Sequence, residues 1–418
     1  MQITIIAGGS RGDVQPYVAL GKGLKEAGHT VRVLSSDDFH DLVTDYGLDF
    51  FTTGGSAQAV AQEMQAQLER GNMLKILGQM RQASERQAVQ AAKLGLVACQ
   101  GSDLILGGLS GLFSGQALSE KLGIPLMLAY LVPFVPTSAF PSALTPIPQS
   151  PLTQWLNKPS HHIAQQMMWQ SFRGADTNAR TQVLDLPPGS FWGPFSIIKK
   201  QKQPVLFGYS PEVLPHPKDW DASLHVTGYW FLEPPTGWEP PVDLMNFLQA
   251  GPPPIYIGFG SMSSSNPEET ADMVSQALAR TGQRGVLYAG WGGLEKEQLP
   301  ESVFMTASVP HTWLFPRMAA VVHHGGVGTT AAGLAAGVPS IIVPFFADQP
   351  FWGQRVHQLG VGPKPIPRKR LTVDNLTEAL RRAISDGEMR KKAAQLGERI
   401  RAENGIAQAV AVIEQSAR

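Results

Sequence analysis

The 418-residue chain is predicted to be an α/β protein of two Rossmann-like domains that face each other across a cleft. Three observations predict this fold. Buried-strand patterns alternate with helical patterns, which is typical of parallel βαβ units. The alternation stops at a proline-rich segment, residues 233–241, and then restarts. The length also exceeds what a single hydrophobic core ordinarily organises and suits two domains of about 200 residues each.

The first half opens with a strand, a glycine-rich turn and a helix. The apolar run at 3–7 predicts the strand, residues 8–12 form the turn, and the apolar side of 14–27 predicts the helix. The expected elements that follow are strands at 30–34, 104–106 and 124–131 and a helix at 114–122. Residues 131–159 are rich in proline and are predicted to form a long irregular loop, a type of segment that is usually functional or mobile.

The second half repeats the alternation. Strands are expected at 255–259, 286–288, 320–322 and 340–343, helices at 268–281 and 329–336, and two further helices at the end of the chain. The predicted domains are 1–235 and 236–395, with residues 396–418 forming a C-terminal helix that packs back on the first domain. Ligands of open α/β sheets bind beyond the carboxyl ends of the strands, so the glycine-rich turns of both domains are expected to line the cleft.

Composition excludes several classes of function. Lys+Arg and Asp+Glu both number 34, and this balance argues against a nucleic-acid-binding protein. The single cysteine, Cys99, rules out an intrachain disulfide and a cysteine-based metal site, and it favours a reducing, cytoplasmic location. No apolar stretch is long enough to predict a transmembrane helix, although peripheral contact with a membrane stays open.

The most informative motif is the string His-His-Gly-Gly-Val-Gly-Thr-Thr at 323–330, between a predicted strand and a predicted helix. Glycines let the backbone approach a bulky anion, and the start of a helix presents free N–H groups and a positive dipole to it. Thr329 adds a hydroxyl donor and His324 a ring donor. A diphosphate needs this combination of donors, whereas a glycine turn beside a core histidine would explain only part of it.

Four segments carry a resemblance to a known family. They are residues 9–16 (GSRGDVQP), 258–262 (GFGSM), 309–315 (VPHTWLF) and 323–350, which ends in PFFADQP. The chain resembles the inverting UDP-glycosyltransferases with two Rossmann-like domains, the GT-B type. Within them it is most similar to the sterol glucosyltransferases and the bacterial glycosyltransferases that decorate antibiotics and other natural products. The resemblance covers both domains and implies a nucleotide-sugar donor on the second domain and an acceptor on the first.

The resemblance assigns donor contacts residue by residue. The diphosphate contacts would be His324, Gly326, Gly328, Thr329 and Ser261, with Ser10 and Arg11 as further candidates. Asp348 and Gln349 would bind the sugar hydroxyls, which suits a carboxylate and an amide. The nucleoside candidates are Ser308, Val309, His311 and Trp291. Many relatives stack uracil on a tryptophan where this chain has Ser308, and plant-type members hold ribose with a glutamate where it has Ala332, so the uridine preference is inherited from the family alone.

Asp13 stands where many relatives carry a catalytic histidine and where the sterol and antibiotic enzymes carry aspartate. As a general base it would take the proton of an acceptor hydroxyl during direct attack on the anomeric carbon, with inversion, while His324 and the helix start stabilise the leaving diphosphate. A capping carboxylate at the helix start is the simpler alternative for Asp13. Relatives with the histidine pair it with a second residue, an aspartate, and at that position this chain has Gly107-Gly108. The difference is consistent with an aspartate base, which needs no such partner.

Acceptor selection is expected in the first domain. Its candidate residues are aromatic side chains on or near the irregular segments: Phe113, Tyr130, Phe134, Phe140, Trp155 and Trp169. Core packing would explain any one of them, but together they favour an apolar hydroxylated acceptor such as a sterol, triterpenoid, polyketide, phenolic compound or lipid. Glucose is the sugar that the family favours.

No metal ion and no cofactor are expected, since the glycine-lined helix start would itself neutralise the diphosphate of the UDP-sugar co-substrate. Several alternatives stay open: a dTDP-sugar donor, a dinucleotide-dependent oxidoreductase, a nucleotide-sugar epimerase or phosphorylase, and a non-catalytic homologue that activates a partner transferase. The turn at 8–12 lacks the Gly-x-Gly-x-x-Gly spacing, which argues against the oxidoreductase. Asp13 and the pair Asp348-Gln349 argue against the epimerase and the phosphorylase. The presence of both Asp13 and His324 argues against the non-catalytic homologue.

Overall fold

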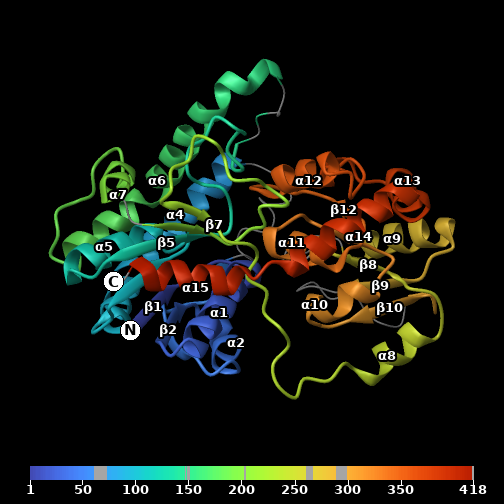
Figure 1. Ribbon diagram of the computed structural model, residues 1–418, viewed down its shortest axis with the longest axis horizontal. Helices are drawn as coiled ribbons and strands as arrows, with labels where there is room; N and C mark the ends of the chain where they lie inside the picture. The colour runs from blue at the N-terminus through green and yellow to red at the C-terminus, as the bar shows by residue number, and fades with distance from the viewer. Residues whose placement is uncertain are drawn as a thin grey trace. The chain divides into compact units, whose positions relative to one another are not determined.

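The computed structural model describes residues 1–60, 73–145, 147, 151–201, 204–259, 267–288 and 299–416 (Figure 1). The described chain divides into two compact units. Unit 1 holds the described residues up to 232 together with 404–416, and unit 2 holds 233–403. Each unit contains its own parallel β-sheet, as the alternating sequence pattern predicts. Among the described residues, no helix has both the length and the apolar content needed to cross a bilayer.

The sheet of unit 1 has the strand order β3-β2-β1-β4-β5-β6-β7, and its described neighbours all pair in parallel. Ile3 and Ile5 of the central strand are fully buried, as a strand covered on both faces requires. The strands are β1 (Gln2–Ile6), β2 (Thr30–Ser35), β3 (Asp49–Thr52), β4 (Leu104–Gly107), β5 (Leu126–Tyr130), β6 (Val205–Phe207) and β7 (Leu224–Val226). The strand order reverses between β1 and β4, so the loops after these two strands meet at a topological switch point.

Helices of unit 1 differ from the sequence expectation in three places. The first helix begins at Arg11 rather than 14, the long helices α4 and α6 were not expected, and residues 151–159 are helical instead of irregular. The helical elements are α1 (Arg11–Glu26), η1 (Asp37–Phe39), α2 (His40–Thr44), α4 (Met73–Cys99), α5 (Leu112–Leu122), η2 (Pro151–Leu156), α6 (Asn157–Gln182), α7 (Phe195–Gln201) and α15 (Gly405–Ser416). Helices α4 and α6 pack against each other along their length.

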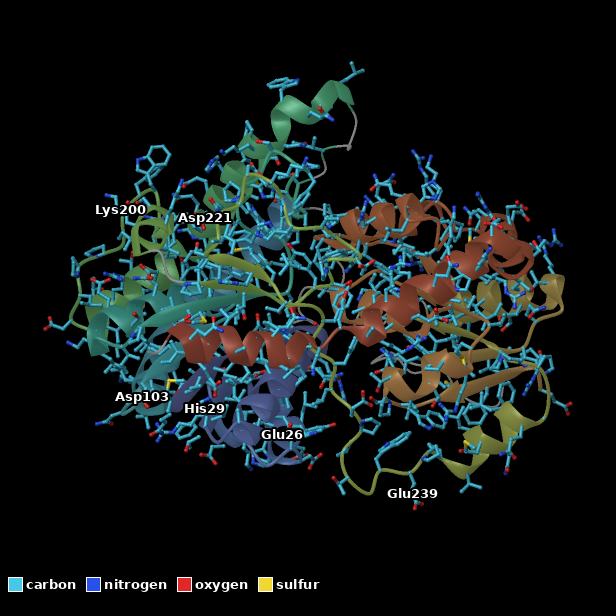
Figure 2. All side chains as sticks on the ribbon, in the orientation of Figure 1. Glu26, His29, Asp103, Lys200, Asp221 and Glu239 are labelled. Carbon is cyan, nitrogen blue, oxygen red and sulfur yellow. The ribbon has the colours of Figure 1, made fainter. Side chains whose placement is uncertain are left out.

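The C-terminal helix α15 belongs to unit 1 and packs against α1, where the two helices lie side by side (Figure 1). Gly23 of α1 leaves the space that Ile406 fills, because a Cβ there would lie 2.2 Å from the Ile406 side chain. At the far end of the pair, Nε2 of His29 lies 3.2 Å from the Glu414 carboxylate. His29 and the neighbouring Glu26 are labelled in Figure 2. The last helix therefore packs on unit 1 through α1.

The sheet of unit 2 has the order β10-β9-β8-β11-β12, again in parallel, so β8 and β11 lie side by side at its switch point. Alternate strand residues face two apolar clusters, one containing Ile255 and Ile257 and the other Tyr256 and Val321. The strands are β8 (Ile255–Gly258), β9 (Gly285–Tyr288), β10 (Val303–Thr306), β11 (Ala320–His323) and β12 (Ser340–Ile342). Both faces of this sheet are buried, as in other parallel sheets.

Helices cover the second sheet. Four α-helices follow β12 instead of the two expected, namely α12, α13 and α14 of unit 2 and α15 of unit 1. Thr372 caps α13 and Asp386 caps α14 by accepting backbone hydrogen bonds, so each of these helices has its own start signal. The helical elements are α8 (Val242–Gln249), α9 (Pro267–Thr281), α10 (His311–Leu314), η4 (Phe315–Arg317), α11 (Val327–Ala336), α12 (Gln349–Gln358), η5 (Arg368–Arg370), α13 (Val373–Ser385) and α14 (Gly387–Ala402).

Candidate functional site

Asp13 stands in the first turn of α1, directly after the glycine loop that follows β1. Its Oδ2 accepts two hydrogen bonds, from the Ser10 amide and from the Ser10 hydroxyl, each 2.8 Å long. Gly9 has φ +113°, and a Cβ at that position would lie 2.6 Å from the same oxygen. The loop therefore wraps closely around the carboxylate and leaves its Oδ1 with no hydrogen bond from the described residues. The Ser10 hydroxyl, a diphosphate candidate, is itself engaged by Asp13.

The electrostatic setting of Asp13 favours a proton acceptor. The residue retains solvent access, yet protein atoms crowd its carboxylate. This desolvation raises its pKa above the usual 3.8, and the hydrogen bonds from Ser10 oppose the shift. A carboxylate with a raised pKa binds a proton more readily, which is the property that a general base needs. Arg11, one residue after the helix cap, is exposed, and its Nε donates to Gln15 over 3.1 Å.

Tyr17 and Ser110 support this loop, although neither was among the sequence-predicted residues. The Tyr17 hydroxyl donates to the Ala129 carbonyl over 2.5 Å, and a Cβ at Gly108 would collide with that hydroxyl. Ser110 accepts a hydrogen bond of 3.0 Å from the Gly8 amide. Gly108, the residue after β4, is thus explained by its close packing against Tyr17. No local sequence pattern indicates this role of the tyrosine, because its partners Ala129 and Gly108 are distant in the chain.

The glycine loop of unit 2 begins at His323, the last residue of β11, which is fully buried. Its Nδ1 accepts a hydrogen bond of 3.1 Å from the Gly325 amide. Gly325 has φ +91°, and a Cβ there would lie 2.6 Å from the Ile342 side chain, so only glycine fits. Gly326 caps helix α11, whose first turn contains Gly328 and Thr329 and no acidic residue. No acidic side chain of its own first turn therefore compensates the positive dipole end of this helix.

His324 projects beside the start of α11. A Cβ at Gly326 would lie 2.5 Å from its Nε2, which shows how closely the imidazole covers this glycine. Its Nδ1 is buried without a hydrogen-bond partner among the described residues. Burial lowers the pKa of His324 to about 4, so the ring is neutral near pH 7 and carries one N–H donor. A neutral donor next to a helix N-terminus suits an anionic ligand.

Asp348 and Gln349 lie next to the same loop, since a Cβ at Gly325 would lie 3.2 Å from the Gln349 carbonyl. Ala347 has φ +54°, an unusual conformation that turns the chain into α12. The Gln349 Oε1 accepts from the amides of Phe345 (2.8 Å) and Phe346 (3.2 Å), and its NH2 group is the part left to donate to a ligand. The Asp348 Oδ2 accepts from the Trp352 indole over 2.8 Å. Both side chains are fixed in orientation.

The nucleoside candidates fall into two groups. Val309 is buried, and the ring of His311 stacks on Phe315 at 4.3 Å, so these two side chains pack inside unit 2, whereas Ser308 is exposed. The Tyr256 hydroxyl lies 3.3 Å from the His311 Nε2. Ser261 and Trp291 lie outside the described residues.

The acceptor candidates also divide. Five are buried, and contacts link Phe113 to Trp169 (ring centroids 5.0 Å apart) and Tyr130 to Phe134 (5.6 Å). Phe195 of α7, which was not predicted, contacts both Phe113 and Phe134 and joins the pairs into one aromatic cluster. Phe140 packs separately, against His161. Trp155 is 74% exposed and lies apart from the cluster's contacts.

Polar side chains of α6 and of the segment between β6 and β7 hold the loop after β5, which carries Phe134 of this aromatic cluster. Asp219 accepts from the Thr137 hydroxyl (2.6 Å) and the Ser138 amide (2.8 Å). Gln165 of α6 donates to the Phe134 carbonyl over 3.2 Å. The part of the chain described here contains no group of three or more His, Cys, Asp or Glu side chains placed as metal ligands.

Two parallel-sheet units, one with a glycine-lined helix start and one with a carboxylate at its switch point, have the architecture of GT-B glycosyltransferases. Among solved structures, the glycosyltransferase VinC in complex with dTDP superposes with a TM-score of 0.67 at 20% identity and covers 100% of this chain and 99% of its own. Residues 3–141 match the glycosyltransferase family 28 N-terminal domain. Residues 292–414 match the C-terminal domain of the erythromycin biosynthesis protein CIII-like family.

Curated relatives agree along nearly the whole chain. The sterol 3-beta-glucosyltransferase UGT80B1 of Arabidopsis thaliana is 36% identical over 98% of this chain and 67% of its own length. A sterol 3-beta-glucosyltransferase of Cryptococcus neoformans is 36% identical over 99% of this chain, which spans 27% of that protein. The chain belongs to the glycosyltransferase family that contains these enzymes. The resemblance inferred from its motifs is confirmed, and so is the fold.

Proposed function

We propose that this chain transfers glucose from UDP-glucose to the hydroxyl of a sterol or a similar apolar acceptor, with inversion at the anomeric carbon. The observation that carries the proposal is the start of α11, where neutral His324 covers Gly326 next to Gln349. Two relatives at 36% identity bear the name sterol 3-beta-glucosyltransferase, which supports the choice of sugar and acceptor.

In the proposed reaction the acceptor oxygen attacks the anomeric carbon as the bond from that carbon to the diphosphate oxygen breaks. The acceptor proton passes to Asp13, and UDP leaves with the bonding electron pair. Both hydrogen bonds from Ser10 end on the Asp13 Oδ2, so Oδ1 is the oxygen proposed to receive the proton. Because a single displacement occurs, the product has the opposite anomeric configuration.

The negative charge that develops on the leaving diphosphate is assigned to the start of α11. Backbone N–H groups at Gly326, Gly328 and Thr329 and the ring of His324 would bind its oxygens, assisted by the helix dipole. Asp348 and Gln349 would bind the sugar hydroxyls, the glutamine through its NH2 group. These donors are held by the loop before substrate binds, which lowers the reorganisation needed during the reaction.

A dTDP-sugar is the second candidate donor. VinC, with the same fold, was crystallised with dTDP. This chain also has Ser308 and Ala332 where many relatives carry a base-stacking tryptophan and a ribose-binding glutamate. Release of nucleoside diphosphate from UDP-glucose and from dTDP-glucose, each with and without cholesterol as acceptor, distinguishes the two.

We expect release only when acceptor is present, with UDP-glucose preferred, and a β-glucoside by NMR of the product, because the donor is α-linked. A product that keeps the α configuration would contradict inversion. Absence of any glucosylated product with both donors, across sterol and phenolic acceptors, would contradict the proposed function and favour a non-catalytic role.

A further inference from the structure

Unit 1 exposes an unusual set of large apolar side chains. Nine exposed large hydrophobic residues occur in the described chain, and seven of them fall between 152 and 197. We call these seven the apolar patch: Leu152, Trp155, Ile163, Met167, Phe191, Trp192 and Ile197. Soluble proteins seldom expose apolar side chains in concentrated groups unless the group forms an interaction surface.

Contacts of α6 make the central part of the patch continuous. Ile163 and Met167 lie one turn apart on its exposed face. Gln166 and Gln170, which share this face, donate to the Phe191 carbonyl over 3.1 Å and 2.9 Å. They hold the loop that contains Phe191 and Trp192 along the helix, and the two loop rings lie 5.1 Å apart. Helix and loop therefore form one surface.

The exposure of the patch does not reflect a poorly packed helix. Other side chains of α6 are buried, among them Trp169, 2% exposed, which donates its indole N–H to the carbonyls of Ser190 and Phe191. The Trp192 side chain, by contrast, is 71% exposed although its neighbours are fixed. The outward orientation of the Trp192 indole is therefore a feature of an ordered loop.

The two chain segments that carry the patch contain basic residues and no acidic ones, and the carboxylate of Glu85 on α4 lies beside Gly174, at the end of the first segment. Lys158, Arg173, Lys199 and Lys200 accompany the patch, and residues 151–175 and 186–201 contain no aspartate or glutamate. Lys200, labelled in Figure 2, belongs to α7, the helix that also carries Ile197. Tryptophans beside lysines are typical of protein surfaces that rest at the level of lipid headgroups, where the rings enter the interface and the ammonium groups meet phosphates.

We propose that unit 1 docks through the apolar patch onto a bilayer that contains anionic phospholipids. The rings of Trp155, Phe191 and Trp192 enter the headgroup region, and Lys199 and Lys200 bind lipid phosphates. Helix α6 carries Ile163 and Met167 of the patch and also the buried Trp169 of the aromatic cluster. Docking therefore brings the candidate acceptor-binding segment to the bilayer, which dissolves apolar acceptors. This consequence rests on the proposed function, whereas docking itself does not.

Flotation of the full chain with vesicles tests the proposal without any turnover. We expect co-flotation with vesicles of equal parts phosphatidylcholine and phosphatidylglycerol, weaker binding to phosphatidylcholine alone, and release by salt. The double variant Phe191→Ser/Trp192→Ser should bind roughly tenfold more weakly. Lys199→Gln/Lys200→Gln should lose about fivefold per lysine on anionic vesicles only. The matched control Val97→Ser/Val242→Ser, at exposed apolar residues outside the patch, should bind like the original chain.

Equal flotation of the ring variant and the original chain would overturn the proposal, and so would failure of the original chain to float with either vesicle. Sedimentation velocity without lipid tests whether a second copy of the chain, rather than a bilayer, binds the apolar patch. A dimer that the ring substitutions convert to monomer would assign the patch to a second copy of the chain. The variant Lys199→Gln/Lys200→Gln tests the proposal independently if the ring variant folds poorly. Loss of glucosylation with flotation intact would count against the proposed function alone.

Discussion

The buried imidazole of His323 receives at Nδ1 the hydrogen bond of the Gly325 amide, over 3.1 Å. A ring nitrogen accepts a hydrogen bond only when it carries no proton, so His323 must be neutral, with its hydrogen on Nε2. Burial, and to a smaller extent the neighbouring His324 and His311, holds its pKa well below the usual value. The bond fixes the residue that precedes the cap of α11, and His323 is therefore a positioning residue for the loop that we propose binds the diphosphate.

Substitution of His323 separates this role from simple packing. In His323→Leu the Gly325 amide loses its buried acceptor, and we expect the Kd for UDP to rise about tenfold, since an unsatisfied buried amide costs about 1–3 kcal/mol. His323→Asn places a carbonyl oxygen near the former Nδ1 and should restore most of the affinity. Calorimetric titration with UDP measures both. Equal affinities in the two variants would show that the hydrogen bond does not position the loop.

His324→Ala removes the ring donor beside the helix start, and we expect UDP to bind about 10- to 100-fold more weakly because a hydrogen bond to a charged group is lost. The lowered pKa, about 4, means that the ring protonates only below that pH. Affinity for UDP-glucose should therefore stay constant from mildly acidic to mildly alkaline pH. An affinity that falls in step with loss of a proton near the ordinary histidine pKa would contradict a neutral donor.

Asp13→Asn should leave UDP affinity unchanged while kcat falls about 10²- to 10⁴-fold, the usual contribution of a general base. The asparagine oxygen can still accept from Ser10, so the loop should keep its shape. Since the protein atoms that crowd the carboxylate desolvate it and raise the Asp13 pKa, the acid limb of kcat/KM should lie above pH 3.8, with activity lost as pH falls through the raised pKa. Unchanged turnover in the variant would remove Asp13 from the mechanism.

Much of the fold could be read from the sequence because buried parallel strands leave continuous apolar runs, as in 3–7 and 320–322. The helix α6 could not, since its buried face carries Ser160, His161, Gln165 and Asp176, which give no apolar period. Polar contacts such as the bond from Gln165 to the Phe134 carbonyl hold it instead, and they form only in the folded chain. The expected irregular loop consequently overlaps a helix.

The candidate site shows the same division. Glycines at 325 and 326 indicate that another group approaches the backbone closely, and the structure places Gln349 and His324 beside them. The supporting role of Tyr17 depends on a contact with Gly108, 91 positions away in the chain, and no local pattern could indicate it. The aromatic candidates were gathered by composition, which could not tell that Trp155 faces outward while Trp169 faces inward.

Asp176 on α6 is predicted to lower the stability of unit 1 at neutral pH. Its carboxylate is buried, and desolvation raises its pKa from 3.8 to about 6 although Arg180 lies 4.0 Å away. The folded state therefore binds a proton that the unfolded state releases, so the free energy of unfolding should fall as pH rises from about 4 to 6. Asp176→Asn avoids the buried charge and keeps an acceptor oxygen, and it should gain about 1–3 kcal/mol at pH 8.

Urea unfolding at pH 5 and pH 8 measures this effect, with Asp185→Asn, an exposed carboxylate on the following segment, as the matched control. The advantage of Asp176→Asn should shrink at pH 5, where the native carboxyl is mostly protonated, and the control should shift equally little at both values. A loss of stability at pH 8 in Asp176→Asn would mean that the ion pair with Arg180, which also binds Glu120 at 2.8 Å, outweighs desolvation. In that case the three charges stabilise the α5–α6 contact as an ion-pair network, and Glu120→Gln should destabilise unit 1 as well.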